Sequence, residues 1–390
     1  MFNIKTMNTI SETGLSLLVK RGYNIGKELD NPDGMIIRSA DLHEYEFNPE
    51  LLAIARAGSG VNNIPIMECA EKGIAVFNSP GANAEAVKEQ VMCTMVLASK
   101  DIIGGIEWVK SIADRGDEIP ELVEKGKNSF SGPELLGKTL GVIGLGAIGA
   151  LVSNIALEFG MKVYGYDPFM SVDAAWKLSR EVKHAEDINE IYEVADFISI
   201  NVPYTPETHY MLNEQAFSKM KTGVRIINES RAEIVDDLAM TTALDTGKVG
   251  RYVTDFPNSV ILKAPNVIAM PHLGACTPES EERCVEMAAA QIADYLENGN
   301  IKNSVNLPDA SLSRMGVCRL CVIHRNVPRM LTSILDFISE RNINVEHMIN
   351  KAREEYAYTI VDLNKKIGPQ TAALMREMDN ILRVRVIYYD

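Results

Sequence analysis

The sequence contains no run of 18 apolar residues, so we expect no membrane-spanning helix and no membrane partner. Residues 1–6 are not followed by the apolar segment of a secretory signal peptide, and we expect none. Basic residues are too few to balance the acidic ones: 39 Lys and Arg stand against 53 Asp and Glu, a net charge of −14. This balance disfavours nucleic acid as a partner. An anionic substrate would need a local basic site to hold it against the overall field.

Cysteine is also scarce, with six residues in a chain of 390. Scattered thiols in a long chain without a secretory signal are typical of reducing compartments, so we expect a cytoplasmic location. Cys318 and Cys321 have the C-x-x-C spacing found in metal and redox sites. They lie in an alternating apolar run, residues 317–323, and residues three apart on a strand point to opposite faces. We therefore interpret both as core residues and expect no metal site.

The most informative segment follows a short apolar strand that ends at Ile143. Gly144, Gly146 and Gly149 come directly after it in G-x-G-x-x-G spacing, and an apolar helical pattern follows. The first glycine permits a tight turn, the second lets the backbone approach a pyrophosphate, and the third lets the helix pack closely on the strand. The N-terminus of that helix offers free N–H groups to phosphates. The expected dinucleotide-binding residues are Gly144, Gly146, Ala147, Ile148 and Gly149.

A second apolar strand, residues 162–166, ends at Asp167. An acidic residue at this point can bond the ribose hydroxyls of NAD and would repel the 2′-phosphate of NADP. Strand, glycine turn, helix, strand and acid together predict an NAD site. The alternative is a glycine-rich turn in an unrelated α/β protein.

The rest of the chain alternates strand and helix patterns, which predicts parallel sheets with helices on both faces. Residues 1–95 contain short strands, and the alternation is stronger over residues 137–273. A long helix is expected over residues 277–296, because Thr277 can cap it and Pro278 suits its first turn. We interpret the polar residues 303–314 as a linker. Residues 315–390 then give strand, helix, strand, strand, helix and strand, the order of a ferredoxin-like unit.

Several segments together resemble the D-isomer-specific 2-hydroxyacid dehydrogenases, and the resemblance covers nearly all of residues 30–305. The matching segments are residues 56–64, 78–89, 201–208, 227–236 and 271–274. The C-terminal unit resembles an ACT domain.

The resemblance implies an α/β fold with two doubly wound parallel-sheet domains and a C-terminal ferredoxin-like ACT domain. The expected parts are a discontinuous substrate-binding domain (residues 1–95 and 280–306), an inserted Rossmann NAD-binding domain (96–279) and the ACT domain (315–390). The glycine fingerprint begins after residue 141 rather than near residue 10, which fits an inserted cofactor domain independently of the resemblance.

The resemblance also implies an activity: NAD-dependent oxidation of 3-phosphoglycerate to 3-phosphohydroxypyruvate, the entry step of serine biosynthesis. L-serine is then a candidate effector, and a homodimer or homotetramer is expected. One alternative is a dehydrogenase for another 2-hydroxy acid, which the ACT unit and Arg38 disfavour. The other is a non-catalytic NAD-sensing corepressor, which Arg231 and His272 disfavour.

Oxidation of a 2-hydroxy acid needs a cation for the carboxylate and a base for the hydroxyl proton. Arg231 follows the strand at residues 224–228, and its planar guanidinium can pair bidentately with a carboxylate. His272 ends the strand at residues 267–270 and can act as the base. We expect both to be catalytic; the alternatives are a surface ion-pair arginine and a structural histidine.

The matched segments imply further cofactor contacts: Val202, Pro203, Ser230, Asp255 and Gly274. The family usually has a glutamate five residues after the aspartate matched by Asp255, and it orients the histidine. Here that position is Val260. Either another acid replaces the glutamate in space, or His272 acts alone with a lower pKa.

Two polar sets complete the expectations. Arg38 ends a strand and can bind a phosphate, as can the donors in residues 59–60. The expected substrate ligands are Arg38, Ser39, Ser59, Gly60 and Asn83. In the ACT unit, polar residues match serine-binding positions, often shared across a two-fold axis between subunits. The expected effector ligands are His324, Asn326 and Asn344.

Overall fold

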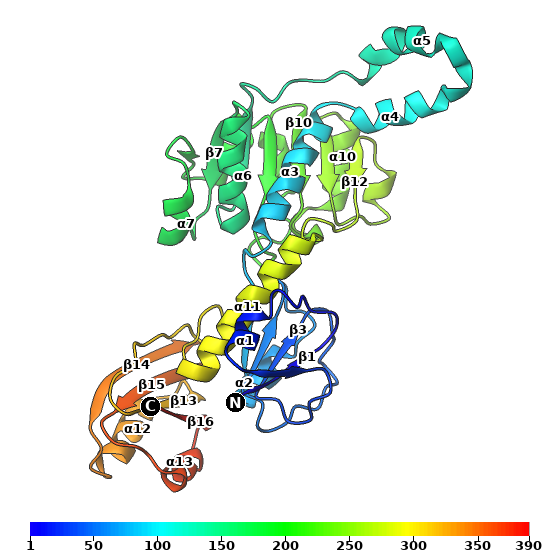
Figure 1. Cartoon of the computed structure of the whole chain (residues 1–390). Helices are drawn as coiled ribbons and strands as arrows, with labels where there is room; N and C mark the ends of the chain where they lie inside the picture. The colour runs from blue at the N-terminus through cyan, green and yellow to red at the C-terminus, as the bar shows by residue number, and fades with distance from the viewer. Residues whose placement is uncertain (390) are drawn as a thin grey trace. The chain divides into compact units, whose positions relative to one another are not determined.

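A computed structural model of the chain describes residues 1–389 (Figure 1). It consists of two compact units: Met1–Asn83 with Pro278–Asp390, and Ala84–Thr277. The second unit is inserted between the two pieces of the first. The sequence boundary expected at residue 95 would divide helix α3 (Ala84–Ser99), whereas the whole of this helix lies in the second unit. Within residues 1–389, no helix combines the length and the apolar character that a membrane crossing needs.

The first unit contains a parallel sheet of five strands in the order β2-β1-β3-β4-β5. Its strands are β1 (Asn3–Thr6), β2 (Asn24–Gly26), β3 (Gly34–Ile37), β4 (Ala53–Arg56) and β5 (Ala75–Phe77). All residues of β3 and β5 are buried, which is typical of parallel strands covered on both faces. Its helices are α1 (Ser16–Lys20), α2 (Ile66–Glu71) and the long α11 (Pro278–Asn298).

Helix α11 packs across the five-stranded sheet. Its apolar side chains join those of β1, β3, β4 and α1 in one core cluster. A Cβ atom on Gly34 would lie 2.6 Å from Ile292 Cδ1, so β3 can approach the helix only because it begins with glycine. The helix begins at Pro278, as the sequence predicts.

The C-terminal part of the first unit is an antiparallel sheet in the order β14-β15-β13-β16. Its elements are β13 (Cys318–Arg325), α12 (Met330–Ser339), β14 (Val345–Arg353), β15 (Tyr356–Leu363), α13 (Pro369–Arg376) and β16 (Ile381–Tyr388). This is the predicted ferredoxin-like order. Cys318 belongs to the core under α12 and α13, whereas Cys321 belongs to the cluster that contains α11. The two thiols therefore point to opposite faces, as the strand pattern predicts.

The interpretation of residues 303–314 as a linker is wrong. Ser304 and Asn306 are buried, and the Asn306 side chain accepts a hydrogen bond from Val76 N at 2.9 Å and donates one to Ile74 O at 2.9 Å. These polar side chains satisfy the free edge of β5, so the segment continues the sheet as an irregular strand. Its polarity serves backbone hydrogen bonding, not solvation.

The second unit contains a parallel sheet of seven strands in the order β12-β11-β10-β9-β6-β7-β8. The strands are β6 (Thr139–Ile143), β7 (Lys162–Tyr166), β8 (Lys183–His184), β9 (Phe197–Ile200), β10 (Val224–Asn228), β11 (Val249–Thr254) and β12 (Val267–Ala269). Besides α3, its helices are α6 (Ala147–Glu158), α7 (Val172–Lys177), α8 (Ile188–Val194), α9 (Glu214–Lys219) and α10 (Asp237–Asp245). Short 3-10 turns are η3 (Ala232–Ile234) and η4 (Ile261–Lys263). The sheet order reverses between β6 and β9, and ligands of doubly wound sheets bind at such a point.

A helical arm separates α3 from β6 and extends away from the sheet of the second unit (Figure 1). It consists of α4 (Ile102–Ser111), η1 (Ala113–Glu118), α5 (Ile119–Gly126) and η2 (Lys127–Phe130). Every residue of α4 and α5 is at least partly exposed, including Ile106 at 50% and Val109 at 43%. The sequence pattern did not single out this arm.

Candidate active site

The glycine-rich turn joins β6 to α6 at the point where the sheet order reverses. Gly144 has a φ of +88°, and a Cβ atom there would lie 2.6 Å from Asn201 O. A Cβ atom on Gly149 would lie 1.8 Å from Gly144 O. Neither position can hold a side chain, so the turn and the close packing of α6 both require glycine.

The N-terminus of α6 is open to a ligand. Gly146 is its N-cap, and within residues 1–389 no side chain caps the helix and no atom lies within 4 Å of a Cβ built on Gly146. Ala147 and Ile148 begin the helix. Backbone N–H groups and free space at a helix N-terminus are what a pyrophosphate needs, so this turn fits a dinucleotide.

Asp167 lies beside this turn because β7 pairs with β6. Its Oδ2 accepts a hydrogen bond from Leu145 N at 2.8 Å, and its Oδ1 accepts one from Phe169 N at 2.9 Å. The carboxylate thus braces the glycine turn, and each oxygen keeps acceptor capacity for a ribose hydroxyl. A 2′-phosphate here would meet this negative charge.

The other expected cofactor residues follow strands of the same sheet, at the carboxyl edge. Val202 and Pro203 follow β9, and Ser230 follows β10, where its hydroxyl donates to Ile200 O at 2.7 Å. Asp255 follows β11, and Gly274 lies after β12. The topology therefore brings all of them to one edge of one sheet.

Arg231 and His272 also lie at this edge, and Phe256 links them. The guanidinium carbon of Arg231 is 5.7 Å from the centroid of the Phe256 ring, and the His272 ring centroid is 4.7 Å from it. Both polar side chains are exposed. A cation and a candidate base thus share one aromatic neighbour.

The turn that carries Arg231 is braced by Asn228, the last residue of β10. The buried Asn228 side chain donates to Arg231 O at 2.8 Å and accepts from Ser230 N at 3.1 Å. The guanidinium itself donates to Ser230 O at 2.6 Å. Sequence reasoning placed Arg231 at the strand end but missed the role of Asn228.

Two acidic residues also follow strands at this edge, Glu229 after β10 and Asp255 after β11. Asp255 is only 3% exposed, and its Oδ1 makes no hydrogen bond to any atom of residues 1–389. Burial raises the pKa of Asp255, while the nearby charges of His272 and Arg231 lower it. Asp255 is therefore an acid in electrostatic contact with His272. Val260, at the usual glutamate position, is the N-cap of the turn η4.

Glu229 is the second acid, and sequence reasoning missed it. Burial raises the pKa of Glu229 to about 7, although Thr94 and Gln90 lower it through hydrogen bonds at 2.8 Å and 3.1 Å. The charge of Asp255 raises it further. A glutamate directly after the apolar strand Val224–Asn228 was the available signal.

In the first unit, the expected substrate ligands follow three adjacent strands. Arg38 and Ser39 follow β3, Ser59 and Gly60 follow β4, and Asn83 follows β5. Ser59 Oγ donates to Asn83 Oδ1 at 3.4 Å. The parallel strands place these residues along one edge. Arg38 forms an ion pair with Glu281 at 2.7 Å, so its charge already has one partner.

The expected effector residues are less accessible and are not together in one chain. His324 is 2% exposed, and its ring nitrogens face Arg325 O at 2.8 Å and Thr359 Oγ1 at 2.9 Å. An effector contact through His324 requires one of these bonds to break. Asn326 and Asn344 are exposed but lie at opposite ends of the antiparallel sheet.

Comparisons with known proteins agree with this geometry. Residues 104–274 match the family described as D-isomer specific 2-hydroxyacid dehydrogenase, NAD binding domain. These residues form an NAD-binding domain that is similar to that of the D-isomer-specific 2-hydroxyacid dehydrogenases.

Individual relatives carry a more specific name. A D-3-phosphoglycerate dehydrogenase of Methanocaldococcus jannaschii is 32% identical over 87% of this chain and 63% of its own length. That of Haemophilus influenzae is 29% identical over 88% of this chain and 83% of its length. The NAD⁺-bound 3-phosphoglycerate dehydrogenase of Entamoeba histolytica has a TM-score of 0.61 and 27% identity, over 78% of this chain and 98% of that one. The chain spans 63% and 56% of the length of the Methanocaldococcus and Synechocystis relatives.

Proposed function

We propose that the chain is an NAD-dependent dehydrogenase that oxidises D-3-phosphoglycerate to 3-phosphohydroxypyruvate. The observation that carries this proposal is the pairing of Arg231 and His272 around Phe256, at the carboxyl edge of a sheet whose glycine turn fits a dinucleotide. The names of the relatives supply the particular substrate.

The residues divide the chemistry between them. When bound at the glycine turn, NAD would supply the acceptor for the hydride that leaves C2 of the substrate. Arg231 binds the substrate carboxylate through two parallel hydrogen bonds. His272 removes the hydroxyl proton, and the Asp255 carboxylate stabilises the imidazolium that forms. Asp255 therefore takes the electrostatic role that the family assigns to the missing glutamate.

Binding of the substrate phosphate is the role proposed for Arg38, Ser39, Ser59, Gly60 and Asn83. Arg38 would exchange its contact with Glu281 for the phosphate. This exchange is inexpensive because the Arg38 side chain is 39% exposed and an exposed ion pair contributes only about 0–1 kcal/mol.

Initial rates of NADH formation test the proposal. D-3-phosphoglycerate should be oxidised with a kcat/KM well above those for D-glycerate and D-lactate, and NAD should be preferred to NADP. Faster oxidation of an unphosphorylated acid would instead assign another 2-hydroxyacid dehydrogenase. NAD binding without turnover of any of them would favour a corepressor.

Two finer points belong to the same proposal. The exposed apolar side chains of the arm, among them Ile106 and Val109, fit a contact with a second copy of the chain, which gives the expected homodimer or homotetramer. Replacing both by Asp should shift the sedimenting species toward monomer, and a monomeric unaltered chain would reject the assembly. The cytoplasmic location stays a prediction that cell fractionation tests.

Serine binding is the remaining regulatory point. Asn326 of one chain and Asn344 of another could meet if two C-terminal sheets pair about a two-fold axis. Serine should then inhibit, and Asn344→Ala should relieve inhibition while activity without serine stays near normal. Calorimetry without serine binding at millimolar concentration, together with unchanged activity, would reject this regulation.

A further inference from the structure

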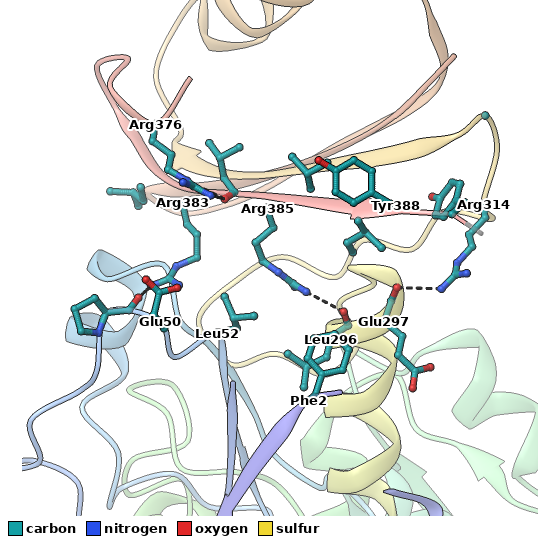
Figure 2. A pocket seen from close by; sticks show the side chains of 17 residues that line it. Phe2, Glu50, Leu52, Leu296, Glu297, Arg314, Arg376, Arg383, Arg385 and Tyr388 are labelled. Atoms are coloured by element: carbon teal, nitrogen blue, oxygen red, sulfur yellow. Dashed lines mark hydrogen bonds between the residues drawn. The ribbon is translucent and has the colours of Figure 1, made fainter. Parts of the chain in front are cut away.

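A groove of about 1050 Å³ lies in the first unit, between the edge strand β16 and the end of α11 (Figure 2). Its apolar lining includes Phe2, Leu52 and Leu296. The C-terminal sheet and the five-stranded domain both contribute walls to it. None of the residues assigned above to NAD, substrate or serine lines this groove.

Four arginines dominate the polar lining of the groove: Arg314, Arg376, Arg383 and Arg385. Among residues 1–389, no carboxylate oxygen lies within 4 Å of any of their charged nitrogens, although twelve ion pairs occur elsewhere in the chain. Two acidic residues, Glu50 and Glu297, also line the groove. Glu297 already binds Arg21 at 2.5 Å and Tyr23 at 2.8 Å. The local charge is therefore positive in a chain whose net charge is −14.

The hydrogen bonds of these arginines go to uncharged groups. Arg383 donates to Pro49 O and Lys72 O at 3.0 and 2.8 Å, and Arg385 donates to Tyr295 O and Leu296 O at 3.1 and 2.9 Å. Figure 2 shows both side chains pointing from β16 toward the opposite wall. These bonds hold the two walls together and fix the guanidinium planes, but they neutralise no charge.

The contacts of Arg376 and Arg314 leave their charges available too. Arg376 donates to Val384 O at 3.3 Å, within its own domain, and its side chain is exposed. Arg314 donates to Asn298 Oδ1 at 2.7 Å and to Glu297 O at 3.0 Å. The pKa of Arg383 is lowered by burial and by the like charges of Arg385 and Arg376, while Glu50 and Tyr295 act in the opposite direction. A bound anion would offset the electrostatic repulsion between these guanidinium groups.

We infer that the groove binds a small phosphorylated molecule, whose phosphoryl group is held between Arg383 and Arg376 and whose organic part lies against the apolar wall. Guanidinium groups pair with phosphate oxygens through parallel, charge-assisted hydrogen bonds. The volume suits a ligand of metabolite size. Because both domains line the groove, an occupant would also strengthen the packing of the C-terminal sheet on the five-stranded domain.

Calorimetry on the full chain tests this inference with two probes, glycerol 3-phosphate and inorganic phosphate. Both should bind the unaltered chain and raise its Tm. Arg376→Ala and Arg383→Ala should each weaken binding by at least about tenfold. Arg341→Ala is the matched control, because Arg341 stacks on Phe337 outside the groove and should leave binding unchanged. Arg38→Ala is the second control. It removes the proposed phosphate ligand of the active site, so binding in the groove should persist in this variant.

The Arg376 variant keeps the test decisive, because Arg376 donates to Val384 O within its own domain, whereas Arg383 and Arg385 donate to backbone carbonyls of the opposite wall. Tighter binding of glycerol 3-phosphate than of inorganic phosphate would show that the organic part is recognised, and equal binding would assign the groove to free phosphate. Absence of binding up to about 10 mM, or binding that survives both groove substitutions, would overturn the inference. A lowered Tm in Arg383→Ala without any anion effect would show that the arginines only join the domains.

Discussion

Phe256 lies between Arg231 and His272, the side chains proposed to bind and to deprotonate the substrate. An aromatic face attracts cations with about 0.5–2 kcal/mol, so the ring can orient Arg231 and stabilise a protonated His272. Phe256→Ala should lower kcat/KM for 3-phosphoglycerate by about tenfold, and Phe256→Tyr should restore most of it. Steady-state kinetics check this, with exposed Val260→Ala as the control. Full activity in Phe256→Ala would show that the ring has no positioning role.

Glu229 gives the folded chain a pH dependence that can be measured. Its carboxyl has an ordinary pKa of 4.5 and a folded value of about 7, because burial disfavours the charge. Below pH 4.5 both states hold the proton. Between the two values only the folded state holds it, so stability falls as the pH rises, by on the order of 3 kcal/mol in total.

Glu229→Gln should remove this dependence. The unaltered chain should lose stability relative to the variant between pH 5 and pH 8, as measured by denaturant unfolding at each pH. Glu233→Gln, on the exposed turn nearby, should follow the unaltered chain. Parallel curves for the unaltered chain and Glu229→Gln would contradict the buried, protonated state of this acid.

At the scale of elements, the paired strands β13 and β15 are connected by a fully buried ion pair. Arg319 Nε and Nη2 donate to the two oxygens of Asp362 at 2.7 and 2.9 Å, and both side chains are 0% exposed. Arg319 also donates to Asn298 O at 2.8 Å, at the end of α11. The pair thus ties the C-terminal sheet to the helix that ends beneath it.

Asp362→Asn should destabilise the first unit by about 3–5 kcal/mol, because it leaves a buried guanidinium without its counter-charge. Thermal unfolding should show a lowered Tm for this unit, and Asp336→Asn on the exposed side of α12 should not. An unchanged Tm would mean that Arg319 finds sufficient compensation in backbone carbonyls.

Elements built from local signals could be predicted from the sequence, and those built from distant contacts could not. The glycine turn and Asp167 follow from spacing alone, since a strand, a tight turn and a helix N-terminus are set within about 30 residues. The segment at Ser304 and Asn306 was predicted wrongly, because the backbone groups that it satisfies are more than 200 residues away in the sequence. Glu229 and Phe256 were missed because a strand pattern predicts which way a side chain points but not which distant residues it contacts.

At the scale of the whole molecule, the sequence predicts the classes of sheet and their order along the chain, and the structure confirms both. It does not predict that the C-terminal sheet packs against the end of α11 within one unit. The arginine groove depends on that packing, because Phe2 and Glu50 meet residues after 314 only in the folded chain. Sites formed by residues that are far apart in the sequence cannot be recognised from residue spacing.

The proposed roles of Arg231 and His272 in the NAD-dependent oxidation of 3-phosphoglycerate are tested most directly by the initial rate of NADH formation in three chains. The unaltered chain should turn over. His272→Asn should lower kcat by about 10²–10⁴-fold as the loss of a general base, and Arg231→Ala should raise KM and lower kcat. Absence of NADH formation by the unaltered chain with 3-phosphoglycerate would contradict the proposed activity, and nearly full activity in His272→Asn would contradict the role of His272 as the base.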